Sequence, residues 1–174
     1  MFRQGFDARS IKPILLTGEQ TIKHDRQLVV DQLANALNEH PVTVMFIDSA
    51  YGAPVAVRLK QMGFRNVHEV NFGGASSDPY AENTRAAMWK AMKEAMPKLA
   101  IDQHDHKLAA ELAAPGFHIN KKNKLVLESK DEMKRRGVAS PDRADALALT
   151  WALPVRLSRR ETRWAPVGSS PWAG

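Results

Sequence analysis

The chain has 174 residues, of which 44% are hydrophobic and 25% charged, as in an ordinary globular domain. It contains no cysteine, which excludes disulfides and thiolate metal sites and fits a cytoplasmic protein. No apolar run approaches the roughly 20 residues that span a bilayer, and the N-terminus lacks the apolar core of a signal peptide. The formal net charge of +6 favours a polyanionic partner over a membrane.

The first half of the chain predicts strands alternating with helices. Residues 10–22 are typical of extended segments around a turn at Gly18, and 24–40 carry apolar residues at helical spacing. The stretch "VTVMFID" (42–48) is almost all apolar and β-branched or aromatic, as in a strand covered on both faces.

A strand–helix–strand unit follows from the next segments. We expect a helix to begin at Pro54 and to end at Gly63, because proline favours the first helical position and glycine the position after the last. The short strand "VHEVNF" (67–72) comes next. Strand, helix and strand in this order predict a parallel crossover and an α/β class.

The second half predicts further helices and a hairpin. Apolar periodicity indicates helices over 82–96, where Trp89 is expected in the core, and over 106–114. Residues 118–129 are typical of a hairpin, and "KDEMKRRG" of a short helix or turn. A last helix should start with Ser140 as N-cap and Pro141 at its first position.

The composition changes after Pro154 to arginine, serine, proline, tryptophan and glycine. We therefore expect one domain over 1–154 and a basic, flexible tail over 155–174. The predicted fold class is α/β, with a mixed sheet flanked by helices.

Three aspartates are the candidate site. Asp48 ends a strand, where side chains of open α/β sheets face a functional crevice. Asp142 and Asp145 lie three residues apart, on one face of the last helix. Three converging carboxylates would suit Mg²⁺ or Mn²⁺, and two such ions can clamp both oxygens of a phosphodiester displacement. Asp142 and Asp48 also have plainer explanations, since aspartate often caps a helix or ends a strand. Asp145 is harder to explain in this way, because its neighbours in the sequence are apolar.

The positive charges gather in two groups that flank the aspartate pair. Contact with DNA phosphates and simple surface solubility explain them about equally well. The two groups are Lys121, Lys122, Lys124, Lys130, Lys134, Arg135 and Arg136, and Arg156, Arg159, Arg160 and Arg163.

Several motifs over about residues 10–155 resemble the nuclease domain of tailed-phage terminase large subunits. In chain order these motifs are "FIDSAYGAPVAVRLKQMGF", "VNFGG", "ENTRAAMWKAM", "KLAAEL" and "LVLESKDEMKRRGVASPDRADALALTWA". The final motif is the most specific, and its Asp-x-x-Asp-Ala-Leu pattern also resembles the acidic helix of Holliday-junction resolvases.

This resemblance implies a ribonuclease-H-like fold and two-metal cleavage of concatemeric duplex DNA during genome packaging in the bacterial host. It assigns Asp48 and Asp142 to the family's second and third acidic ligands, and Asp145 to an acid that binds metal in the resolvases. Lys130 would lie near the substrate phosphate, with Lys134, Arg135 and Arg136 as further DNA contacts. The implied protein partners are the small terminase subunit and the portal or procapsid.

Two departures from the family pattern qualify these expectations. The family's first catalytic aspartate precedes the segment "FRQGFDARS", so we expect the chain to lack that strand and Asp7 to lie in a turn. No G-x-x-x-x-G-K-[ST] phosphate loop occurs, so we expect no ATP site in the chain. The alternatives to an active nuclease are a truncated remnant that only binds DNA or packaging partners, and a junction resolvase.

Overall fold

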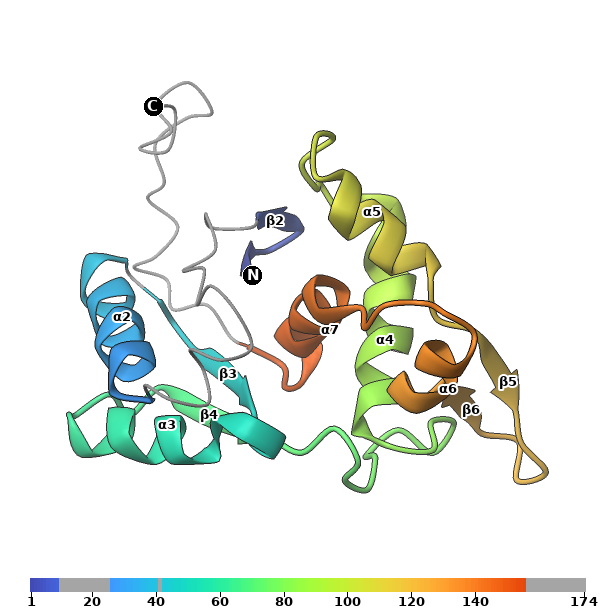
Figure 1. Cartoon of the computed structure of the whole chain (residues 1–174), viewed down its shortest axis with the longest axis horizontal. Coiled ribbons are helices and arrows are strands. Elements are labelled where there is room, and N and C mark those ends of the chain that lie inside the picture. The colour runs from blue at the N-terminus through green and yellow to red at the C-terminus, as the bar shows by residue number, and fades with distance from the viewer. Residues whose placement is uncertain (10–25, 41, 156–174) are drawn as a thin grey trace.

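A computed structural model describes residues 1–9, 26–40 and 42–155 of the chain. The extended segments expected within 10–22, and residues 156–174 of the expected tail with their arginine group, lie outside these ranges. No helix within them is long and apolar enough to cross a membrane. The elements (Figure 1) are β1 (Phe2–Gln4), β2 (Asp7–Arg9), α2 (Arg26–Glu39), β3 (Met45–Asp48), α3 (Ser49–Gln61), β4 (Val67–Val70), α4 (Thr84–Ala95), η1 (Met96–Lys98), α5 (His106–Ala113), β5 (Phe117–Ile119), β6 (Leu125–Leu127), α6 (Lys130–Arg135), α7 (Asp142–Ala148) and η2 (Leu149–Trp151).

The β3–α3–β4 unit confirms the predicted parallel crossover. β3 pairs in parallel with β4, with Asp48 opposite Val70 at the carboxyl ends of both strands. Helices α2 and α3 pack beside this pair (Figure 1). The residues of β3 are half-buried rather than covered on both faces, so the strand is less enclosed than its composition predicts.

Helix α3 starts five residues earlier than predicted. It begins at Ser49, and Pro54 lies inside it instead of at its first position. The reason is local, because the carboxylate of Asp48 accepts a hydrogen bond from the Ala50 amide at 3.2 Å and so caps the helix. The sequence analysis placed the start of the helix at Pro54 and treated Asp48 only as the last residue of the strand.

The described strands form three two-stranded sheets, one parallel and two antiparallel, within the α/β class that we expected. The β1–β2 and β5–β6 pairs are antiparallel hairpins. Single bridges, Asp7 with Ala100 and Ala81 with Leu125, connect these hairpins to other segments, and two bonded residues do not extend a sheet. Asp7 is the first residue of β2, so its predicted place in a turn is wrong; Gly5, with a φ of 58°, lies in the hairpin turn that precedes it.

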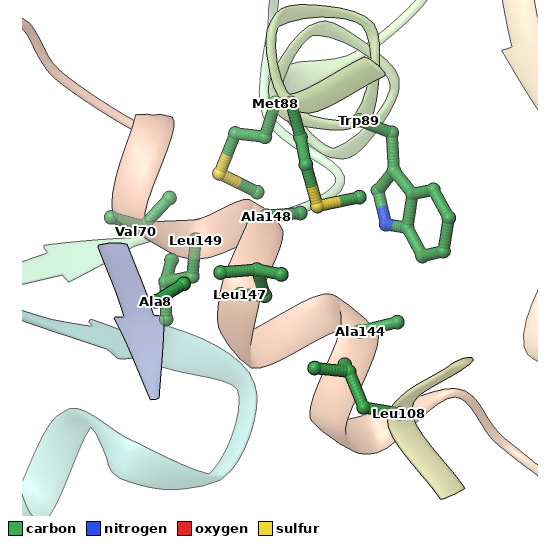
Figure 2. Packing of buried hydrophobic residues seen from close by; sticks show 10 residues of the cluster. Ala8, Val70, Met88, Trp89, Leu108, Ala144, Leu147, Ala148 and Leu149 are labelled. Carbon is green, nitrogen blue, oxygen red and sulfur yellow. The ribbon is translucent and has the colours of Figure 1, made fainter. Parts of the chain in front are cut away.

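Within the described residues, the core consists of two apolar clusters. One surrounds α4, α7 and η2 and includes Met88 of α4 and Leu147 of α7 (Figure 2). The other is formed by α2, α3 and β4, with Leu59 fully buried. Helix α7 lies between the β3–β4 pair and helix α4 (Figure 1). Most of its residues are buried, so the acidic first turn belongs to a core helix, as predicted.

Candidate functional site

The first turn of α7 has an unusual start. The helix begins at Asp142, and Pro141 occupies the N-cap position without a side-chain hydrogen bond, so the predicted cap by Ser140 is wrong. The Ser140 hydroxyl instead donates to Asp142 Oδ1 at 2.6 Å. Asp142 itself is exposed, which leaves its carboxylate accessible to a ligand.

Asp145 is buried, with 5% of its side chain exposed. Its Oδ1 accepts hydrogen bonds from Arg85 Nε and Trp89 Nε1, each at 2.8 Å. Both donors come from α4, where a spacing of four residues puts them on one helix face. A buried carboxylate requires such partners, and the Arg85 guanidinium supplies the opposite charge.

The ammonium of Lys130 lies between the two aspartates. Lys130 Nζ is 3.2 Å from Asp142 Oδ1 and 3.3 Å from Asp145 Oδ2. The lysine is the first residue of α6, which Ser129 and Glu132 fix through a reciprocal capping box. Burial lowers the pKa of Lys130, but the charges of Asp145 and Asp142 outweigh burial and raise it above its usual value. A cation therefore already occupies the position between these carboxylates.

The two aspartates of α7 supply oxygen atoms, the type of ligand that hard metal ions prefer. Asp145 Oδ2 is buried and is paired with the Lys130 ammonium at 3.3 Å, but within the described part of the chain it accepts no hydrogen bond of good geometry. Asp142 offers a second, accessible carboxylate beside the same ammonium. An oxygen ligand set of this kind suits Mg²⁺ or Mn²⁺, and Lys130 shows that the site attracts positive charge.

Asp48 belongs to a different element from this pair. It is half-buried at the end of β3 and caps α3. Across residues 1–9, 26–40 and 42–155, no group of three or more histidine, aspartate or glutamate side chains is arranged to hold a metal ion. The structure thus brings Asp142 and Asp145 together around Lys130, and leaves the predicted convergence with Asp48 as a prediction.

The three other basic residues of the predicted DNA contact differ in their surroundings. Arg136 forms a two-point ion pair with Glu128, with both N–O distances at 2.7 Å, and also donates to the Ala114 carbonyl. The Arg136 hydrogen bonds, followed by one from the Gly116 amide, lower the pKa of Glu128 to about 2. Lys134 and Arg135 are exposed on α6 and remain accessible to a phosphate.

Sequence reasoning missed Arg85 and Glu111 and understated Trp89. Trp89 is buried as predicted, yet its indole N–H also serves Asp145. Arg85 and Glu111 are charged residues at buried positions of amphipathic helices, and that pattern was the available signal.

Comparisons with known proteins define the fold class. No family model and no curated protein sequence matches the chain. Solved structures do match, and they give the chain the α/β, ribonuclease-H-like fold of a terminase nuclease domain. The nuclease domain of the large terminase subunit gp2 of bacterial virus Sf6 aligns with a TM-score of 0.60 and 20% identity over 72% of each chain.

Two further structures of the Sf6 domain carry a lysine-to-alanine substitution and match equally well. The form with manganese has a TM-score of 0.61 and 20% identity over 72% of each chain. The form with calcium has a TM-score of 0.60 at the same identity, over 72% of this chain and 71% of that one. At this identity the likeness establishes the fold, and the chemistry has to be argued from the site.

Proposed function

We propose that this chain is a metal-dependent DNA endonuclease of the terminase type, with Asp48, Asp142 and Asp145 as its metal ligands. The observation that carries the proposal is the pair of carboxylates around Lys130, on a fold shared with a terminase nuclease domain. Structures of the Sf6 domain with manganese and with calcium support a divalent cation at such a site. Mg²⁺ or Mn²⁺, bound as two ions, is the proposed cofactor.

The bound ions would supply the charge that polarises the scissile phosphate and activates water. Asp142 and Asp145 would hold the cation, with Asp145 kept in place by Arg85 and Trp89. Lys130 would turn its ammonium from the aspartates to a phosphate oxygen of the substrate. Lys134 and Arg135 would contact the DNA backbone, and because phosphates carry no sequence information, cleavage should be sequence-nonspecific.

The proposed setting is the cutting of concatemeric DNA during genome packaging in the cytoplasm of a bacterial host. Duplex DNA is the substrate, and the small terminase subunit and the portal or procapsid are the proposed partners. The positive charge of +6 suits the polyanionic substrate.

A second candidate function is DNA binding without cleavage. It is favoured by one observation, that no three-carboxylate metal group exists in the part of the chain that the structure covers. In that case the Asp145–Arg85 ion pair is structural, and the basic surface of α6 accounts for the binding.

Plasmid nicking separates the two functions. We expect the intact chain to nick supercoiled plasmid in Mn²⁺ or Mg²⁺, and Asp48→Ala or Asp142→Ala to reduce nicking to the level seen in EDTA. Asp31→Ala, which removes an exposed carboxylate from α2, is the matched control and should retain full activity. Nicking that persists in EDTA or in both variants contradicts the site, and plasmid binding without nicking favours the second candidate.

A further inference from the structure

Helix α7 cannot cap its own N-terminus. The first amides of a helix have no partner within it, and a side chain at the N-cap commonly accepts from them. Here the N-cap is Pro141, which has no polar side-chain atom. The neighbouring Ser140 hydroxyl is directed to Asp142. With only seven residues, α7 also has little stability of its own.

Glu111 of α5 supplies the missing cap from another helix. Its Oε2 accepts from the Arg143 amide at 2.6 Å and from the Ala144 amide at 3.1 Å. The side chain is buried, and its negative charge faces the positive end of the α7 dipole. These are hydrogen bonds to a charged acceptor, the stronger kind in proteins.

A second link joins the same two helices. Arg143 Nη1 donates to Asp105 Oδ1 at 2.7 Å. Asp105 is in turn the N-cap of α5, where it accepts from the Leu108 amide at 3.0 Å. Helix α5 therefore holds Arg143 through both its backbone and its side chain, directly after Asp142 in the chain.

We infer that Glu111 is a positioning residue that sets the cation affinity of the Asp142–Asp145 pair, an inference that rests on the proposed function. The two amides that Glu111 binds belong to the residues between these aspartates. Fixing that backbone turn fixes the separation and direction of the two carboxylates. Glu111 touches no reacting atom and acts only through α7.

The test is a Mn²⁺ titration of the full chain by calorimetry, well below the lowest melting temperature of the variants. We expect Glu111→Ala to weaken Mn²⁺ binding about 10-fold, as for other residues that support metal ligands. Glu111→Gln should weaken it less, because its amide oxygen still accepts from the two backbone N–H groups.

Leu108→Ala is the matched control, since Leu108 is buried in the same helix with 1% of its surface exposed. It should lower the melting temperature and leave Mn²⁺ affinity unchanged. Equal affinity in wild type and Glu111→Ala, or an equal loss in Leu108→Ala, overturns the inference and leaves the proposed function intact. A wild-type chain that neither binds Mn²⁺ nor nicks DNA overturns both.

Hydrogen exchange gives a second measurement that needs no catalysis. The Arg143 and Ala144 amides should exchange slowly in wild type and faster in Glu111→Gln. If Glu111→Ala does not fold, the glutamine variant decides the question through exchange and Mn²⁺ affinity together. Unchanged exchange and unchanged affinity in the glutamine variant contradict the positioning role.

Discussion

The two cores of this molecule are built on different principles. Among the described residues, those buried in the cluster of α2, α3 and β4 are all apolar, namely Val29, Val30, Ala34, Val55, Ala56, Leu59 and Val67. The region of α4, α5 and α7 contains the buried charged residues Arg85, Glu111 and Asp145 in addition to its apolar side chains. The first cluster is held by burial of apolar surface, and the second also depends on matched charges.

The buried charges indicate that the functional site lies in the region of α4, α5 and α7. Burying an ion pair is costly, and apolar residues of similar volume often serve stability as well or better. The three buried charged residues of the described ranges nevertheless surround the first turn of α7, next to the exposed Asp142 and Lys130. Charged residues are rarely buried, so their gathering beside two accessible charged side chains is consistent with the proposed nuclease site.

The largest expected effect breaks the charged region. Asp145→Ala leaves the Arg85 guanidinium buried without its counter-charge, and should lower the free energy of unfolding by about 3–5 kcal/mol. Urea unfolding monitored by tryptophan fluorescence measures this change. The double variant Arg85→Met/Asp145→Leu should recover most of the loss, because it removes both charges; a double variant less stable than Asp145→Ala contradicts the ion-pair explanation.

A somewhat smaller effect is expected in the apolar cluster. Leu59 is fully buried, and Leu59→Ala should lower the free energy of unfolding by about 3 kcal/mol through lost burial and the cavity that remains. The same urea experiment measures it. Mn²⁺ affinity of the folded variant should equal that of wild type, since Leu59 lies near the C-terminal end of α3, far along the helix from the proposed ligand Asp48 at its N-cap. A weakened Mn²⁺ response would show that the two regions are coupled.

The smallest effect concerns the Glu128–Arg136 ion pair at the edge of the charged region. The pKa of Glu128 is lowered from 4.5 to about 2 in the folded chain. Its contribution to stability is therefore complete above pH 4.5 and is lost as the pH falls through about 2. Glu128→Gln should be slightly less stable than wild type at pH 7, and the difference should vanish near pH 2. Melting curves across this range test it, and a difference independent of pH contradicts the assignment.

The helices were predictable because their signals are local. Asn83, Asp105 and Ser129 each cap the helix that follows within the same few residues. The β5–β6 hairpin likewise forms between neighbouring segments. The start of α3 was predicted wrongly because two local signals compete there. Pro54 is a strong signal for the first position of a helix, whereas the helix in fact begins after the cap at Asp48.

The sequence by itself determined that Asp142 and Asp145 share one face of a helix, since a spacing of three residues requires it. Only the tertiary structure decided which side chains contact the two aspartates and the backbone between them. Arg85 lies 60 positions from Asp145 in the chain, and Glu111 lies 33 from Ala144. Contacts over such separations depend on how whole helices pack, and helical periodicity specifies a face without specifying its neighbour.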